Sequence, residues 1–93
     1  MLGYVSEREF KLQFEDSFKQ FFKPLCFHAM SFVKDADIAK DIVHDVFLTT
    51  WTQREKIDFT QPMLPYYLSL TRNRSLNYLD HLKVRARHEE SEY

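Results

Sequence analysis

The chain has 93 residues, of which 44% are hydrophobic and 16% aromatic, and its formal net charge is −1. This composition excludes a disordered chain, and the single Gly and three Pro argue against strands joined by tight turns. No apolar run approaches the roughly 20 residues needed to cross a bilayer, and one cysteine cannot form an internal disulfide. We therefore expect an all-α bundle of about four helices without membrane insertion, in the cytoplasm. The expected single domain spans 1–93, with a core of about 6–88 and a tail over 89–93.

The first predicted helix begins at Ser6, because Ser6 and Glu9 have the spacing of a capping box. Four phenylalanines then repeat at helical intervals: Phe10, Phe14, Phe18 and Phe21. Pro24 has no backbone N–H to donate, so we expect it to break or kink this segment and to stand early in a second helix. The apolar positions of that second helix are Leu25, Cys26, Ala29, Met30 and Val33.

The third predicted helix has Asp35 or Asp37 as its N-cap and runs to about Arg54. At 100° per residue, five apolar side chains fall on its core face: Ile38, Ile42, Val43, Val46 and Phe47. The opposite edge carries Asp37, Asp41 and Asp45 four residues apart, where like charges destabilise a helix by a few tenths of a kcal/mol per pair. No lysine or arginine stands in this ladder.

A solvated face is the common explanation for such an edge, and Asp37 could serve only as a cap. His44 and Leu48 fall within the acidic edge, however, and Trp51 falls beside it. A large apolar side chain among like charges indicates a docking patch with an apolar anchor and acidic steering. The expected partner surface is basic.

The segment "KIDFTQPMLP", residues 56–65, is the only sizeable predicted loop, and a fourth helix runs from about Tyr66 into the 80s. Its predicted buried side is Tyr67, Leu68, Tyr78, Leu79 and Leu82. A second line consists of Tyr66, Leu70, Asn73, Asn77 and His81. Amides offer the donors and acceptors that base edges require, and aromatic rings stack on unpaired bases. An ordinary polar face is the alternative explanation.

Charge is unevenly distributed along the chain. Residues 35–58 hold six acidic and three basic side chains, whereas residues 72–87 hold five basic and one acidic. A domain with this asymmetry suits two partners of opposite charge.

The sequence "FEDSFKQFFKPLCFHAMSFVKDADIAKDIVHDVFLTTW", followed by "PYYLSLTRNRSLNYLDHLK", resembles region 2 of bacterial sigma factors. It is most similar to the small extracytoplasmic-function group, over about residues 10–85. Three elements in order carry the resemblance: an aromatic-rich helix ending at a proline, the acidic "DIVHDVFLTTW" and the amide-containing "SLTRNRSLNYL". Each alone would be a weak signal.

The resemblance implies that the acidic helix docks on the clamp helices of the largest catalytic subunit of RNA polymerase, a basic coiled coil. A cationic partner would explain why the carboxylates tolerate their mutual repulsion. His44 stands where the family usually has Gln. The implied polymerase contacts are Asp37, Asp41, His44, Asp45, Leu48 and Trp51.

The resemblance also implies recognition and melting of promoter DNA during transcription initiation. The loop at 57–64 and the fourth helix would capture a base flipped from the minus-ten element of the melted non-template strand, at a cost of a few kcal/mol for the flip. Asn73 matches the asparagine that lines the family's base pocket. The implied nucleic-acid contacts are Phe59, Tyr66, Leu70, Arg72, Asn73, Arg74, Asn77, Lys83, Arg85 and Arg87.

The sequence offers no catalytic, metal-binding or cofactor-binding pattern. Cys26 stands among apolar residues, no two histidines are spaced i, i+4, and Gly3 alone cannot build a phosphate-binding loop. We therefore expect no enzyme. The alternative function is a helical adaptor for protein partners with no role in DNA binding.

Family members continue into region 4, a helix-turn-helix domain that reads the minus-thirty-five element. The present sequence ends at Tyr93, so it is expected to be region 2 on its own. A continuation with helix-turn-helix patterning would exclude the adaptor. An anti-sigma factor is a further partner that the sequence leaves open.

Overall fold

The computed structural model describes residues 6–91, with side chains described through His88. Three long helices follow one another: α1 (Glu7–Val33), α2 (Ala36–Thr52) and α3 (Leu64–Ser91). A short 3₁₀ turn, η1 (Arg54–Lys56), lies between α2 and α3, and the described residues contain no strand. The all-α prediction is confirmed, with three helices where about four were expected.

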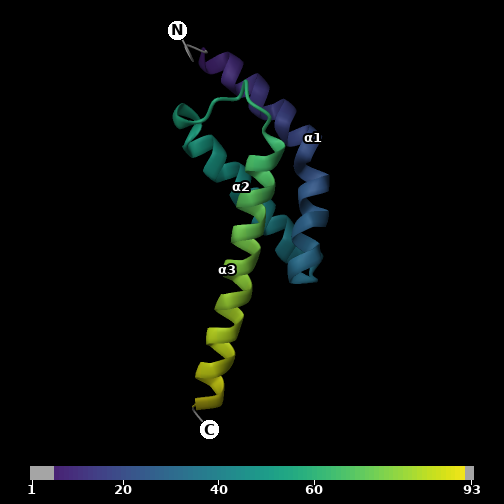
Figure 1. Cartoon of the computed structure of the whole chain (residues 1–93), viewed down its shortest axis with the longest axis vertical. Helices are drawn as coiled ribbons and strands as arrows, with labels where there is room; N and C mark the ends of the chain where they lie inside the picture. Colours follow the sequence, from purple (N-terminus) through teal and green to yellow (C-terminus); the bar gives the residue numbers. More distant parts are fainter. Residues whose placement is uncertain (1–5, 92–93) are drawn as a thin grey trace.

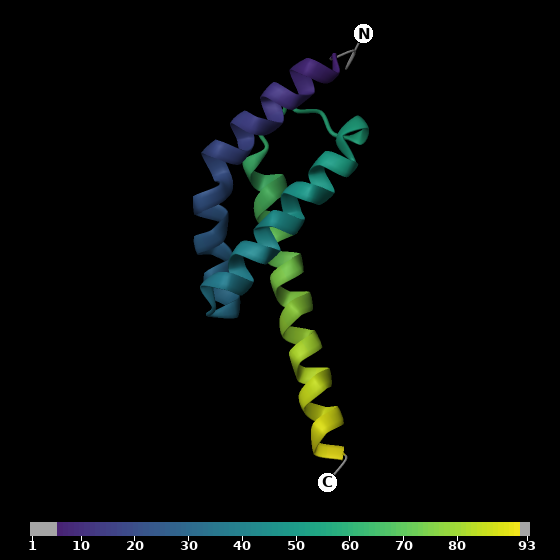
Figure 2. The ribbon, with the colours of Figure 1, turned by 180° about the vertical axis from the view of Figure 1, so that it is seen from behind.

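The three helices pack against one another, and α3 extends well past the other two (Figure 1). Seen from behind, α2 crosses α3, while α1 lies to one side of both (Figure 2). The helical core is therefore near one end of an elongated molecule, 60 × 22 × 18 Å in extent. The predicted end of the last helix in the 80s is too early, because α3 continues to Ser91. Of the predicted tail, 92–93 lie outside the described residues.

Pro24 does not divide α1 into two helices, so that part of the prediction is wrong. The helix continues through the proline and bends in its middle (Figures 1 and 2). Pro24 and Gln20 are both exposed, so water can solvate the carbonyl that the proline leaves without a donor. Ser17 before the proline and Leu25 after it are both buried. Burial on both sides of the proline holds the two halves of α1 against one core.

The predicted starts of α1 and α2 agree with the structure, whereas α3 begins at Leu64, two residues before the predicted Tyr66. The Ser6 side chain accepts a hydrogen bond from the backbone N–H of Glu9 at 3.2 Å. Of the two candidate caps for α2, Asp35 is the N-cap, and its carboxylate accepts from the N–H groups of Asp37 and Ile38 at 2.9 and 3.1 Å. Asp37 lies in the first turn instead. Both caps satisfy backbone donors that have no partner within the helix.

The core face of α2 is as predicted: Ile42, Val43, Val46 and Phe47 are buried, and Ile38 is half-buried. The other buried apolar residues of the core are Leu25, Ala29, Ala39, Met63 and Tyr67. Tyr78 and Leu79, which were predicted to be buried, are half-buried, as are two phenylalanines of the α1 repeat, Phe14 and Phe18.

The buried side of α3 differs from the prediction in its second half. Leu82, predicted to be buried, is 42% exposed, like the other described side chains from His81 onward. Two small polar residues are buried instead, Thr71 and Ser75, and the Ser75 hydroxyl donates to the Thr71 carbonyl at 2.8 Å. Small side chains at these positions allow a close approach between helices.

Candidate functional site

The outer edge of α2 presents the side chains that the sequence predicted for a protein partner. Asp37, Asp41, His44, Asp45 and Leu48 are exposed, and Trp51 is half-buried. Leu48 has 63% of its surface in contact with solvent, which is high for a large apolar residue of a packed helix. The structure thus places these residues together on one helix, around an exposed apolar side chain.

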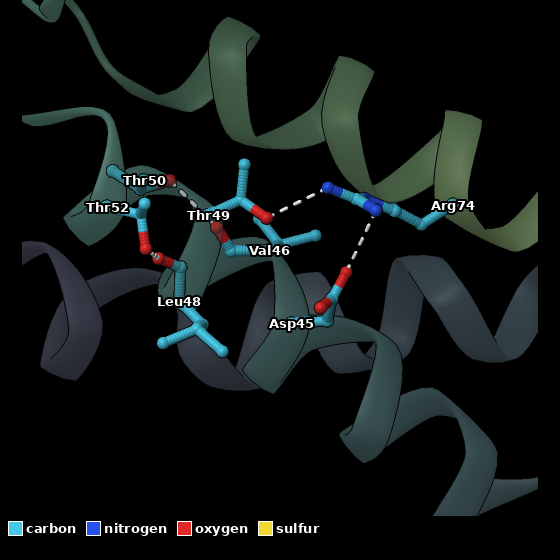
Figure 3. A network of polar contacts seen from close by, with 7 residues as sticks. All are labelled: Asp45, Val46, Leu48, Thr49, Thr50, Thr52 and Arg74. Atoms are coloured by element: carbon cyan, nitrogen blue, oxygen red, sulfur yellow. Dashed lines mark hydrogen bonds and ion pairs between the residues drawn. The ribbon is translucent and has the colours of Figure 1, made fainter.

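The acidic edge is partly neutralised from another helix. Arg74 of α3 lies 3.1 Å from the Asp45 carboxylate and donates a hydrogen bond to the Thr49 hydroxyl at 2.8 Å (Figure 3). Arg74 stands 29 positions further along the chain than Asp45, so the spacing of the acidic residues does not indicate this partner. Arg74, predicted to contact DNA phosphates, faces α2 in this structure.

A groove between α1 and α2 opens on the other side of the acidic edge. Its volume is about 550 Å³, and Figure 3 shows Leu48 pointing away from Arg74. The lining residues are Lys11, Phe14, Glu15, His44, Leu48 and Trp51. The three residues from α1 were not predicted as site residues, since only the packing of α1 on α2 brings them there.

The aromatic side chains of this groove are held in place by their neighbours. Trp51 packs on Phe14 with ring centroids 5.1 Å apart, and the guanidinium of Arg54 lies 4.5 Å from the Trp51 ring. The His44 ring lies 5.1 Å from that of Phe22. Trp51 and His44 therefore each contact an aromatic ring of α1, and Leu48 between them is exposed.

The predicted amide line of α3 divides into two parts. Tyr66 and Leu70 pack against the core, whereas Asn73 and Asn77 are exposed. Asn77 and His81 line a groove of about 390 Å³ between α2 and α3, together with Ile38, Asp41, Ile42, Asp45, Arg74 and Tyr78. Asn73 is not among the lining residues, so the two amides face different surroundings.

The loop before α3 is anchored to the domain by apolar contacts. The Phe59 ring meets the Phe10 ring of α1 edge to face, with centroids 5.4 Å apart. Asp58 accepts hydrogen bonds from the backbone N–H and the hydroxyl of Thr60, and these bonds lower the pKa of the Asp58 carboxyl. The loop therefore has a defined shape beside α1, and Phe59 already has an aromatic partner.

The last turns of α3 form a basic arm, defined here as residues 81–88. Every side chain of the arm is exposed, including the cations Lys83, Arg85 and Arg87. Over the described residues, the structure contains ion pairs between Arg54 and Glu7 and between Arg74 and Asp45. The three cations of the arm and Arg72 belong to neither pair.

No three His, Cys, Asp or Glu side chains among those described stand together as a metal site. Burial raises the pKa of the Cys26 thiol, which disfavours the reactive thiolate. None of the described helices is long and apolar enough to cross a membrane.

Comparison with protein families identifies the domain. The family model of sigma-70 region 2 matches residues 18–85, well over half of the chain. The chain belongs to the sigma-70 region 2 family, whose members are non-enzymatic transcription factor domains that bind RNA polymerase and take part in promoter melting. No curated protein and no solved structure matches the chain significantly.

Proposed function

We propose that this chain is the region 2 domain of an extracytoplasmic-function sigma factor. In this proposal the outer edge of α2 docks on the clamp helices of RNA polymerase, and the loop before α3 and α3 itself hold the melted non-template strand. The observation that carries the proposal is the exposed Leu48 beside Asp41 and Asp45 in a chain of this family. No observation specifically favours the adaptor.

The docking surface combines an apolar anchor with acidic side chains. Leu48 would enter the partner's surface, while Asp41 and Asp45 would attract its basic residues. The groove beside Leu48 extends this surface onto α1, through Lys11 and Glu15. Asp37, His44 and Trp51 complete the proposed polymerase contacts.

The DNA surface combines selective and non-selective contacts. Asn73 is exposed and has both a donor and an acceptor, so it can read one base edge. The exposed cations Arg72, Lys83, Arg85 and Arg87 would follow phosphates without reading sequence. Phe59, Tyr66, Leu70 and Asn77 remain proposed contacts near the captured base, with the first three held in place by the core.

Reversal of two charges tests the docking. Asp41→Lys with Asp45→Lys should abolish binding to purified core polymerase while preserving helical content, because both side chains lie outside the core. The matched control is Asp16→Lys with Asp80→Lys, which changes the net charge equally at exposed positions on α1 and α3. Wild-type affinity of the Asp41/Asp45 variant for polymerase would contradict the proposed docking. Leu48→Ala should act mainly on the dissociation rate.

Fluorescence anisotropy with minus-ten-like oligonucleotides tests the DNA contacts. With core polymerase, the domain should prefer single-stranded to duplex DNA, and Asn73→Ala should weaken one base preference by about 1–3 kcal/mol. Arg85→Ala and Arg87→Ala should weaken all sequences alike and each lower the salt slope by about one phosphate. If Asn73→Ala weakened every oligonucleotide equally, capture of a base at this face would be wrong.

The remaining features follow from the same proposal. The whole chain would act as one region 2 domain in the bacterial cytoplasm, where polymerase is found. Without polymerase it should bind DNA feebly, because its net charge of −1 gives little attraction to a polyanion. An anti-sigma factor that covers the same edge of α2 would be a further partner.

A further inference from the structure

Arg74 connects the two proposed binding surfaces. It stands on the helix proposed to bind DNA, yet its guanidinium contacts Asp45 and Thr49 on the helix proposed to bind polymerase. The three side chains lie together in Figure 3. Arg74 therefore competes, from inside the domain, with any external cation that binds Asp45.

The groove between α2 and α3 has the lining that a lysine or arginine side chain requires. Ile38, Ile42 and Tyr78 give it apolar walls, and Asp41 and Asp45 supply two carboxylates one helical turn apart. The aliphatic stem of a basic residue packs on apolar surface while its charged head stays at a polar rim. Arg74 occupies one of the two carboxylates, and no described cation forms an ion pair with Asp41.

We propose that a basic side chain of the polymerase partner enters this groove, pairs with Asp41 and displaces Arg74 from Asp45. The displaced guanidinium then becomes available to a DNA phosphate. This inference rests on the proposed function and adds to it a specific competitor inside the domain. Polymerase docking and phosphate binding are thereby coupled through a single side chain.

The Arg74–Asp45 pair has the properties of a contact that can be exchanged. The two side chains are 37% and 48% exposed, and ion pairs in such contact with water contribute little net stability. A second cation beside Asp45 would repel the guanidinium, so its arrival weakens the internal pair. Because coupling between two binding events is reciprocal, DNA that captures Arg74 should in turn strengthen polymerase binding.

The first half of the inference is that Arg74 competes with polymerase for Asp45, and substitution of Arg74 tests it. Arg74→Gln should bind core polymerase about two- to fivefold more tightly than wild type at low salt, because Asp45 is then free. Arg74→Lys keeps the charge and should bind like wild type. Arg72→Gln removes a neighbouring charge that makes no ion pair to α2, so it should not tighten polymerase binding. Thermal melts check that each variant is folded.

The second half of the inference is that release of Arg74 from Asp45 strengthens DNA binding. Asp45→Asn releases Arg74 without polymerase, so this variant alone should bind a single-stranded oligonucleotide about two- to fivefold more tightly than wild type. In the presence of polymerase, Arg74→Gln should lower the salt slope for DNA by about one phosphate. Without polymerase, the same substitution should leave the slope unchanged, since Arg74 is then held by Asp45.

The outcomes separate this inference from the proposed function. Unchanged polymerase affinity in Arg74→Gln would overturn the competition, and unchanged DNA affinity in Asp45→Asn would overturn the release of Arg74. Neither result affects docking through α2, which is tested by Asp41→Lys with Asp45→Lys. If that double reversal bound polymerase normally, the docking itself would be wrong, and this inference would be overturned with it.

Discussion

The two functional helices differ in how much of their length is packed. Buried residues of α2 extend from Ala39 to Thr50, so the domain fixes its outer edge in space. In α3 the buried residues end at Ser75, and every described side chain from His81 onward is exposed. A surface that binds a protein partner needs an apolar anchor, such as Leu48, on a helix that is fixed in place. Cations on a solvated arm can instead contact the phosphates of a DNA strand. The contrast suggests shape-dependent binding at α2 and charge-dependent binding at the arm.

Among the substitutions that test this comparison, one on the core face of α2 should have the largest effect on stability. Phe47 is 3% exposed and lies against the rings of Phe14, Phe18 and Tyr67. Phe47→Ala should therefore lower the free energy of unfolding by about 3–5 kcal/mol, since it leaves a cavity among these rings. Leu48→Ala, at the adjacent exposed position, should change it by less than about 0.5 kcal/mol. Urea unfolding measures both, and similar losses at the two positions would show that the faces of α2 are wrongly assigned.

The difference between the helices should also appear in local opening. Amide hydrogen exchange of Val43, Val46 and Phe47 should require global unfolding, because both neighbouring helices cover this face. The backbone amides of the arm should exchange on the order of a hundredfold faster or more, since no packed helix opposes their opening. Equal protection in the two segments would contradict the contrast drawn here.

The start of α2 provides a smaller test. Asp35→Ala removes the acceptor of two backbone hydrogen bonds and should lower the free energy of unfolding by about 1 kcal/mol. Asp35→Asn keeps a good capping side chain and should cost much less. Chemical denaturation of the pair distinguishes the cap from the charge. If the two variants lost equal stability, the negative charge at the helix start would matter more than the hydrogen bonds.

Periodicity in the sequence was sufficient for α2, because α2 is packed along its length. A single stripe of apolar residues then defines the buried face, and Ile42, Val43, Val46 and Phe47 all lie on it. The same reasoning failed at Leu82 of α3. Periodicity shows which side of a helix could be buried, but it does not show where the neighbouring helices stop.

Two further features depend on tertiary contacts that the sequence does not display. The continuity of α1 through Pro24 depends on Ser17 and Leu25 being buried on both sides of an exposed proline. The pairing of Arg74 with Asp45 depends on how α3 crosses α2. The acidic edge was visible in the sequence, but its partial neutralisation was not. The family resemblance identified the domain correctly, while the individual contacts remain proposals.

The loop between the two helices should show the smallest effect. Thr60→Val removes one donor to Asp58 and retains the backbone N–H, so the pKa of the Asp58 carboxyl should rise toward its usual value without reaching it. In the wild type the pKa is lower in the folded state than in the unfolded state. Its contribution to stability is therefore present above the unfolded pKa of about 3.9 and is lost as the pH falls through the folded pKa.

Thr60→Val should accordingly be slightly less stable than wild type at neutral pH and equally stable in acid, once Asp58 is protonated in both states. Carboxyl-carbon NMR titration measures the pKa directly. Thr52→Val is the matched control, because the Thr52 hydroxyl donates to the Leu48 carbonyl and not to a carboxylate. A stability difference that persisted at low pH would mean that Thr60 stabilises the loop by a contact other than its hydrogen bond to Asp58. Apolar contacts of Phe59 and its neighbours would then hold the loop in shape, in the way that the core face holds α2 in place. The loop would in that respect resemble α2 and not the arm, whose proposed binding depends on charge.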